Sequence, residues 1–478
     1  MLAVLNEQED DLVERNKPAK SGYQMDMIHG PLAGKILLFA LPLMFSSILQ
    51  LLFNAADVVV VGRYAGEAAL AAVGSTSSLI NLLVNLFVGF SVGTNVVIAR
   101  DLGGGRTENV EAGVHTAVTV ALLSGLILTA LGLAMARTLL VWTASAPDVI
   151  DLATVYLRIY FCGMPVNMLY NFGAAILRAQ GDTRRPLYFL AAAGVINVAL
   201  NLLFVIVFQM SAAGVALATI ISQAVSAVLV LGCLMRDQGP LHLDLRKLRL
   251  DKRVMVQIMR VGLPAGFQGI VFSLSNVVIQ SSINSFGSTA IIAGSAASAN
   301  IEGFVYVAMN AFYQTDLTFT SQNYGAGECG RVDRTLLLCQ GYVVAVGLLL
   351  GCLAAAFGHP LASIYAPGKE EVISQAILRL QYICIPYCLC GVMDVMVGAL
   401  RGLGHSIVPM IVSMVGACGV RLLWVATVFQ LYHTPEVLYL SYPVSWTITG
   451  GVHIAFFLAV RKHAYRECPE LGRSPADR

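Results

Sequence analysis

AGKILLFALPLMFSSILQLLFNAADVVVVG, residues 33–62, is a long, mostly apolar run that contains one lysine and one aspartate. A helix needs about 20 apolar residues to cross the roughly 30 Å hydrocarbon core of a bilayer. The run is therefore long enough to span a membrane. Its acid, Asp57, lies in the second half of the run, toward the outer leaflet. Because an ionisable residue at bilayer depth costs about 2.5 to 3.5 kcal/mol on insertion scales, Asp57 is a candidate for function.

The composition of the whole chain has the same character as this first run. Of the 478 residues, 57% are apolar and only 12% are charged, and the mean hydropathy is +0.73. Soluble domains carry about 25% charged residues, so the composition excludes a water-soluble globule. The net charge is +2, and the basic residues are dispersed over many loops. We therefore expect no nucleic-acid partner.

Twelve apolar stretches are long enough to cross a bilayer, which predicts an all-α integral membrane protein with twelve transmembrane helices. The stretches of the first half cover residues 33–62, 68–99, 113–136, 151–180, 187–209 and 212–235. Those of the second half cover residues 254–285, 290–322, 334–358, 371–401, 407–431 and 436–461.

Arginine and lysine residues gather in every second loop. With both termini in the cytoplasm, the outer side holds only Arg63, Arg137 and Lys369. This asymmetry is what the positive-inside rule requires, whereas the reverse orientation would violate it at nearly every loop. The first apolar run also comes too late, and is too long, for a cleaved signal peptide. We therefore predict a multi-pass membrane protein whose termini are both cytoplasmic and whose helices contact membrane lipids.

The two halves of the chain match each other at a nearly constant offset, which indicates an internal duplication. At an offset of about 222 residues, Leu41-Pro42 matches Leu263-Pro264, Gly103 matches Gly325 and Gly105 matches Gly327. At an offset of about 223 residues, Leu177-Arg178, Gly181 and Pro186 match Leu400-Arg401, Gly404 and Pro409. Each unit has an even number of spans, so we expect two six-helix bundles related by a pseudo-twofold axis along the membrane normal.

The duplication divides the chain into two bundles, two tails and a linker. We expect an N-terminal tail at 1–31, a first bundle at 32–236, a cytoplasmic linker at 237–253, a second bundle at 254–462 and a C-terminal tail at 463–478. Leucine residues alternate with polar residues at the start of the linker, before it becomes strongly basic. Two interpretations stay open: an amphipathic segment on the cytoplasmic leaflet, or a solvated linker.

Polar side chains in the first bundle form one candidate site. Asn197 and Asn201 are four residues apart and therefore share a helix face. Thr219 on the next span can add a hydroxyl group. Together with Asp57, these residues are candidates for binding a cation or a proton. The alternative is that the asparagines only join helices to one another, and that Asp57 only caps its span near Arg63.

The second bundle contains the buried acids Glu302, Asp316 and Asp394, and Arg421 is the deep cation that we expect to pair with them. Glu302 and Asp394 are candidates for proton or substrate-cation binding, and Asp316, near the cytoplasmic end, is a weaker one. A static ion pair with Arg421 that only fixes helix packing is equally compatible with the sequence.

Three aromatic residues lie on the span at 290–322, which also contains Glu302: Tyr306, Phe312 and Tyr313. They could present ring faces to a cationic ligand, although core packing is the commoner role of such residues.

The enzyme motifs that occur in the sequence lie in the wrong structural context. Gly89-Phe90-Ser91-Val92-Gly93 fits a nucleophile elbow, but it lies within a helical span, where small residues allow close helix packing. The sequence has no HExxH, Walker or CxxC motif. We therefore expect a protein that is not an enzyme and that uses an ion gradient.

The chain resembles the multidrug and toxic compound extrusion (MATE) family, in the branch with bacterial DinF-like and MepA-like proteins. The resemblance covers nearly the full length. It rests on Leu41-Pro42, Asn54-Ala-Ala-Asp57, Val61-Gly62, Leu177-Arg178-Ala-Gln-Gly181-Asp182, Ser321-Gln322-Asn323-Tyr324-Gly325-Ala326-Gly327 and Gly398-Ala-Leu-Arg401-Gly402.

The resemblance implies a V-shaped pair of six-helix bundles that opens alternately outward and inward. It implies export of small organic cations or drugs across the bacterial cytoplasmic membrane, in exchange for H⁺ or Na⁺ and without a cofactor. We expect a monomer. The alternative is a flippase for a lipid-linked or anionic substrate in the same superfamily, and the scarcity of deep basic residues argues against it. A passive channel and an intramembrane enzyme are weaker alternatives.

The resemblance also implies roles for particular residues. Asp57 matches the essential carboxylate of the first span, and Asn197, Asn201 and Thr219 match its polar partners in a cation site. Many relatives have Asp where this chain has Asn201, and the missing charge shifts the expectation from Na⁺ toward protons at these four residues.

In the second bundle, two positions depart from the pattern of NorM-type relatives. Those relatives carry a glutamate in the seventh span, where this chain has Gln268. Asp394 lies near the acidic position of their tenth span, about one turn away. We therefore expect Asp394 to be less closely tied to coupling than Asp57.

Overall fold

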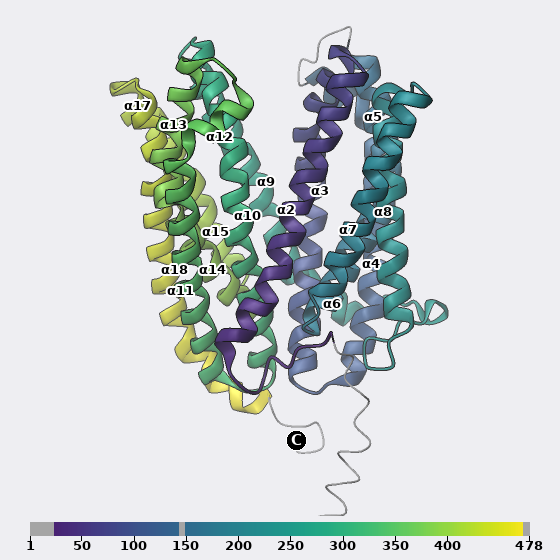
Figure 1. Ribbon diagram of the computed structural model, residues 1–478. Helices are drawn as coiled ribbons and strands as arrows, with labels where there is room; N and C mark the ends of the chain where they lie inside the picture. The colour runs from purple at the N-terminus through teal and green to yellow at the C-terminus, as the bar shows by residue number, and fades with distance from the viewer. Residues whose placement is uncertain (1–22, 143–148, 472–478) are drawn as a thin grey trace, which may run out of the picture.

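The computed structural model describes residues 23–142 and 149–471, and the regular elements in these ranges are all helical. Figure 1 shows two groups of helices side by side, with the last helix ending at the lower end of the view. The first group contains α2 (Leu32–Tyr64), α3 (Glu67–Gly103), α4 (Thr107–Trp142), α5 (Ile150–Cys162), α6 (Met164–Ala179), α7 (Arg184–Leu202) with a π-helical turn at Leu203–Val207, and α8 (Ser211–Met235).

The second group repeats this order of helices with more interruptions. Its last helix continues beyond residue 462, where we expected the bundle to end. The group contains α9 (Lys252–Asn284), α10 (Thr289–Gly325), α11 (Cys329–Ala356), α12 (Gly358–Tyr365), α13 (Glu370–Cys384), α14 (Cys388–Gly402), α15 (Ile407–Ser413), α16 (Val420–Ala426), α17 (Val428–Leu431) and α18 (Pro435–Leu471).

Eleven spans in the described part of the chain are long and apolar enough to cross a membrane, and counting α5 with α6 as one broken span gives twelve. This result confirms the predicted all-α architecture. The span expected at 151–180 is bent by 47° between α5 and α6. Pro165 lies in the first turn of α6, where a residue without an N–H group is tolerated. The corresponding break in the second half, at Ile385–Tyr387, also contains a proline.

The two bundles exchange the first parts of their leading helices. Ile36 and Phe39 of α2 are fully buried in the core of the second bundle, and the Phe39 ring meets Phe319 of α10 at a centroid distance of 5.4 Å. Conversely, Val254 and Ile258 of α9 belong to the core of the first bundle. The predicted boundaries at 32–236 and 254–462 assign each leading helix entirely to one bundle and therefore do not describe this exchange.

Each leading helix returns to its own bundle after an internal proline. Beyond Pro42, α2 packs on α7, where the ring of Phe53 lies against Gly194. Beyond Pro264, Ile279 of α9 is buried in a core cluster of the second bundle. The two prolines therefore lie where the helices pass from one bundle to the other.

Glycines let α3 approach α9 closely. A Cβ atom on Gly89 would lie 2.4 Å from the backbone nitrogen of Gly266, and a Cβ on Gly93 would lie 2.2 Å from the carbonyl oxygen of Ile258. Neither position can accept a larger residue without separating the helices. The interpretation of residues 89–93 as a helix-packing motif is confirmed.

The linker folds onto the first bundle. Leu241 and Leu243 are buried in its core, and the backbone N–H of Asp244 donates to His115 Nε2 of α4 at 3.2 Å. The leucines therefore contact protein, and neither a segment on the leaflet nor a freely solvated linker describes this part of the chain. Of the two predicted tails, residues 1–22 and 472–478 lie outside the described residues.

Candidate functional site

A cavity of about 340 Å³ lies inside the first bundle and contains Asp57. Its lining is rich in amide side chains from five helices, most of which the sequence analysis did not single out. Amides at helical spacing in an apolar span, such as Asn167 and Asn171, are the signal that could have revealed them. The polar lining residues are Gln50, Asn54, Asp57, Asn81, Tyr160, Asn167, Tyr170, Asn171, Asn197, Thr219, Ser222, Gln223 and Ser226.

The four residues predicted as a cation or proton site lie in one hydrogen-bonded row. Asn201 Nδ2 donates to Asp57 Oδ1 and to Asn197 Oδ1, the latter at 3.1 Å. Asn197 Nδ2 donates to Thr219 Oγ1 at 3.5 Å, and the Thr219 hydroxyl donates to the carbonyl oxygen of Val215 at 2.9 Å. The structure therefore brings Asp57 on α2, both asparagines on α7 and Thr219 on α8 together.

The row combines one acid with neutral amide and hydroxyl groups. Asp57 is its one carboxyl group, and the Asn201 amide directs a donor, not an acceptor, at Asp57 Oδ1. Hard cations need several oxygen ligands. Asn201 Oδ1 is buried and has no hydrogen-bond partner among the described residues. No cluster of three His, Cys, Asp or Glu side chains that could hold a metal ion occurs in the described ranges.

Glu302 forms a buried ion pair, but with a partner that we did not expect. Arg379 of α13 donates from Nε to Glu302 Oε1 at 2.7 Å and from Nη2 to Oε2 at 3.0 Å. Ser298 Oγ adds a third hydrogen bond to Oε1 at 2.8 Å. The expected pairing of Glu302 with Arg421 is therefore wrong, because α13, and not α16, lies beside Glu302.

Gln268 belongs to a second polar cluster, built around a buried arginine. Arg401 of α14 donates to Gln268 Oε1 at 2.8 Å and to the Tyr313 hydroxyl at 2.6 Å. Asp394 lies seven residues before Arg401, two turns away on the same face of α14. In the sequence, Arg401 was prominent only as part of the motif Gly398-Ala-Leu-Arg401-Gly402. Its position inside an apolar span was the signal that it is buried.

Arg421 is stacked on aromatic rings and forms no ion pair within the described ranges. Its guanidinium carbon lies 4.2 Å from the ring centroid of Tyr442 and 5.6 Å from that of Trp446, and its Nε donates to Ser445 Oγ at 3.0 Å. Arg421 is also not the only deep cation, since Arg379 and Arg401 are buried as well. The structure does not pair Asp394 with Arg421.

The three aromatic candidates of α10 have different surroundings. Tyr306 is 38% exposed and stacks on Tyr387 at 6.4 Å, so its ring remains available to a ligand. Phe312 is buried against Tyr342, and Tyr313 holds Arg401. Phe312 therefore has the packing role. Asp316 is also fully buried and packs against Gly398 of α14.

The two bundles are joined at the end where α18 ends. Thr318 Oγ1 of α10 donates to Asn95 Oδ1 of α3 at 3.1 Å, and Gln322 Nε2 donates to the carbonyl oxygen of Ala179 at 3.5 Å. Toward the opposite end the two groups of helices diverge (Figure 1). The two bundles are therefore closed against each other at one end and apart at the other.

The repeat glycines lie within this closed end. A Cβ on Gly103 would be 1.9 Å from the Gln322 carbonyl oxygen, and a Cβ on Gly325 would be 2.0 Å from the Arg100 carbonyl oxygen. α3 and α10 therefore meet at two equivalent glycines, one from each half. This contact gives a physical reason for the match of Gly103 with Gly325 in the repeat.

Residues 23–31, just before α2, cross this closed end. Asn323 Nδ2 donates to the carbonyl oxygen of Met27 at 3.2 Å, and Arg331 Nη1 donates to that of Gly30 at 3.1 Å. On the side of the first bundle, a Cβ on Gly181 would lie 2.5 Å from the Met25 carbonyl oxygen. The segment thus contacts both bundles.

Comparisons with known proteins agree with this architecture. A family model described as MatE matches residues 42–203 and 264–426, once in each half. "Probable multidrug resistance protein YoeA" of Bacillus subtilis is 28% identical over 421 residues, which are 86% of this chain and 90% of that protein. The "FAD transporter" of Shewanella oneidensis is 23% identical over 464 residues, which are 94% of this chain and 98% of that protein.

The fold is also found among solved structures. One, described as the outward-facing conformation of a multidrug resistance MATE family transporter of the MOP superfamily, superposes with a TM-score of 0.86 at 19% identity. The match covers 94% of this chain and 100% of that chain. At this identity the likeness concerns the fold alone.

Proposed function

The chain belongs to the MatE family, and from this premise we propose that it is a secondary active transporter that exports organic cations or drugs in exchange for protons. Asp57, in an amide-lined cavity and hydrogen-bonded to Asn201, is the observation that carries the proposal. A single carboxyl group among neutral hydrogen-bonding groups can hold either a cationic ligand or a proton. A relative named as a multidrug resistance protein supports this class of substrate.

Exchange then follows from competition at Asp57. The ionised carboxylate attracts a cation, and the attraction is strong where little water screens it. Protonation removes the charge and frees the cation. Asn201 can form a hydrogen bond with Asp57 in either protonation state. Its Nδ2 donates to the carboxylate, and its Oδ1, which has no partner among the described residues, can accept from the protonated carboxyl group. Neutral Asn201, where a second acid would help to hold Na⁺, favours protons over Na⁺ as the coupling ion.

Alternating access supplies the second half of the cycle. The bundles meet at one end through Thr318, Asn95 and the paired glycines Gly103 and Gly325. Opening this end and closing the other would expose the Asp57 cavity first to one side of the membrane and then to the other. The binding energy of cation and proton in the two states would drive the exchange.

We place the protein in the bacterial cytoplasmic membrane as a monomer, with the closed end facing the cytoplasm. The basic loops between the spans support this orientation through the positive-inside rule. Residues 23–31 and the end of α18 lie at the same closed end, which is consistent with two cytoplasmic termini (Figure 1).

The test is uptake of a fluorescent organic cation into inside-out vesicles. A proton gradient and a sodium gradient are imposed separately, on the native chain and on Asp57→Asn, which keeps the shape of the side chain. Proton-driven uptake that Asp57→Asn abolishes would support the proposal. Asp151→Asn is the matched control, because the Asp151 side chain is 78% exposed on α5. Full uptake by Asp57→Asn would refute a coupling role of this carboxyl group.

A second candidate function is transport of an anionic or lipid-linked substrate. Arg421 favours it, because this buried cation contacts aromatic rings and is in no ion pair within the described ranges. A relative named as an FAD transporter fits this substrate class. Competition of a nucleotide or a lipid-linked diphosphate with the fluorescent cation, lost in Arg421→Gln, would favour this function over cation export.

A further inference from the structure

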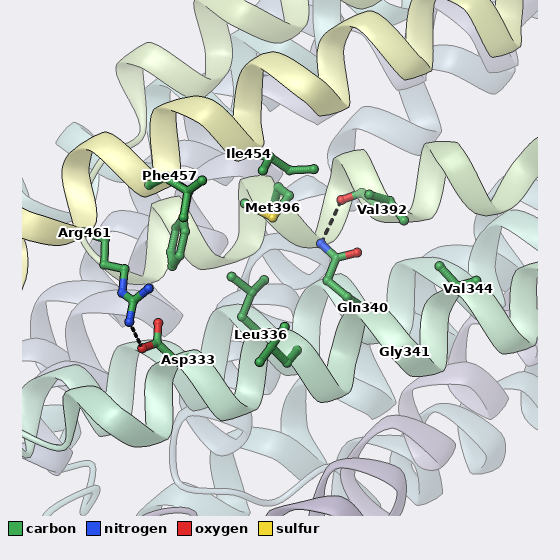
Figure 2. Close-up of a pocket in the computed structure, with 12 residues that line it drawn as sticks. Asp333, Leu336, Gln340, Gly341, Val344, Val392, Met396, Ile454, Phe457 and Arg461 are labelled. Atoms are coloured by element: carbon green, nitrogen blue, oxygen red, sulfur yellow. Dashed lines mark hydrogen bonds and ion pairs between the residues drawn. The ribbon is translucent and has the colours of Figure 1, made fainter.

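A groove on the outer face of the second bundle has no part in the proposed transport cycle (Figure 2). It has a volume of about 650 Å³ and lies between α11 and α18, with α14 contributing to its lining. Leu337 and Leu458 on its rims are 71% and 53% exposed, so the groove opens to the surroundings of the bundle. Its main apolar lining residues are Leu336, Val344, Val392, Met396, Ile454 and Phe457.

The groove is already formed and has room for a chain-like ligand. Gly341 of α11 faces open space, since no heavy atom lies within 4 Å of a Cβ built on it. Gln340 Nε2 donates to the Val392 carbonyl oxygen at 3.1 Å and ties α11 to α14 (Figure 2). From Asp333 to Val344 the lining follows α11 for about 16 Å at 1.5 Å per residue. This length equals about half of a 30 Å hydrocarbon core, that is, one leaflet.

One end of the groove is polar and carries more positive than negative charge. Arg461 Nη2 pairs with Asp333 Oδ2 at 2.6 Å, and the Tyr465 hydroxyl donates to Asp333 Oδ1 at 2.8 Å. A second hollow beside this end is lined by Arg461, Lys462 and Tyr465. Lys462 is exposed and is in no ion pair within the described ranges, so one positive charge remains uncompensated.

We propose that the groove binds an anionic phospholipid, with one acyl chain along the apolar lining and its phosphate at Lys462 and Arg461. The length of the groove fits a chain from a single leaflet, and the basic end lies where the apolar run of α18 stops, at the level of a headgroup. Basic residues at this level attract anionic headgroups. The proposal does not depend on the transport function.

Native mass spectrometry of the full-length protein tests the proposal. The protein in mild detergent is titrated with phosphatidylglycerol and, in parallel, with phosphatidylcholine of the same chains. We expect one tightly held phosphatidylglycerol, bound at least about fivefold more tightly than phosphatidylcholine. Equal retention of the two lipids would overturn the proposal, because it would indicate only general contact with lipid.

Two pairs of variants locate the site. Gly341→Phe fills the groove and should lower phosphatidylglycerol binding about tenfold, whereas Gly232→Phe, at an equally open helix position on α8, should leave it unchanged. Lys462→Gln should weaken binding about threefold, and Lys462→Arg should restore it. Because Lys462 is exposed, we expect its variants to fold, and they test the proposal even if Gly341→Phe does not fold. Native binding by Gly341→Phe, or by Lys462→Gln, would overturn the assignment.

Discussion

The first bundle surrounds a single carboxyl group with amides, whereas the second bundle holds Glu302 in a buried ion pair with Arg379, Arg401 against an amide and Arg421 on aromatic rings. At the repeat offset of 222 residues, Asp57 corresponds to Ile279, and Glu302 corresponds to Ile80. Asp57 and Glu302 therefore each lie opposite an apolar residue in the other half. At these two positions the duplicated halves have kept the helix but not the charged side chain.

The difference teaches which acid can change its charge state at low cost. Glu302 receives two hydrogen bonds from Arg379 and one from Ser298, so its negative charge is matched in place. Asp57 receives one hydrogen bond from a neutral amide. A carboxyl group with one neutral partner can bind and release a proton without leaving a buried cation behind, whereas Glu302 cannot.

The largest expected effect separates the acids of the two bundles. Asp57→Asn should reduce proton-driven cation export to the rate of empty vesicles, whereas Asp394→Asn should stay within about threefold of the native rate. The reason is that Asp57 lies in the amide-lined cavity and Asp394 does not. Vesicle uptake, normalised to folded protein, measures both. An equal loss of uptake in the two variants would show that acids of both bundles take part in coupling, and would contradict the difference between the bundles.

The next effect concerns stability. Glu302→Gln should destabilise the protein by about 3 to 5 kcal/mol, because it leaves the buried Arg379 without a counter-charge. The double variant Glu302→Met with Arg379→Met should recover most of this loss. Thermal unfolding in detergent, followed by circular dichroism, measures it. A melting temperature of Glu302→Gln equal to that of the native chain would show that the pair is not structural.

A smaller effect tests why the first bundle is expected to use protons. Asn201→Asp places a second carboxyl group beside Asp57, and two carboxylates hold a cation better than one. We expect the apparent affinity for Na⁺ to rise about tenfold. Calorimetric titration with NaCl, against choline chloride, measures the change. Asn171→Asp, in the same cavity but outside the row, serves as the control, and an equal gain there would contradict a site at Asn201.

The smallest effect contrasts an exposed ion pair of the first bundle with the buried pair of the second. Arg137 and Asp151 lie 3.2 Å apart, with side chains 63% and 78% exposed. Because water screens such pairs, Asp151→Asn should change the free energy of unfolding by less than about 0.5 kcal/mol. The same melting experiment measures it. A loss of stability as large as that of Glu302→Gln would show that burial does not explain the difference between the two ion pairs.

Features that depend on helical periodicity and apolar length were predictable from the sequence. The span number follows from the length of the apolar runs, and the fourfold spacing of Asn197 and Asn201 places both on the face that meets Asp57. Thr219 was predictable as a partner because consecutive spans of a bundle are often neighbours. The functional roles of these four residues stay predictions.

Features that depend on which distant helices are neighbours were not predictable. Glu302 and Arg379 are 77 residues apart, and nothing near either residue indicates that α10 and α13 meet at this depth. The buried linker residues Leu241 and Leu243 were equally ambiguous, because a leaflet and a protein core favour the same leucine pattern. A single sequence, read alone, contains no signal for such pairings.

The exchange of Ile36 and Phe39 for Val254 and Ile258 has a consequence for synthesis of the chain on the ribosome. The core of the first bundle includes a piece of α9, which is translated after all six spans of that bundle. The start of α2 is translated first, but it packs in the core of the second bundle, whose other helices are translated last. The first bundle therefore cannot finish packing during its own translation, and two fragments cut in the linker would each lack residues that fill their cores.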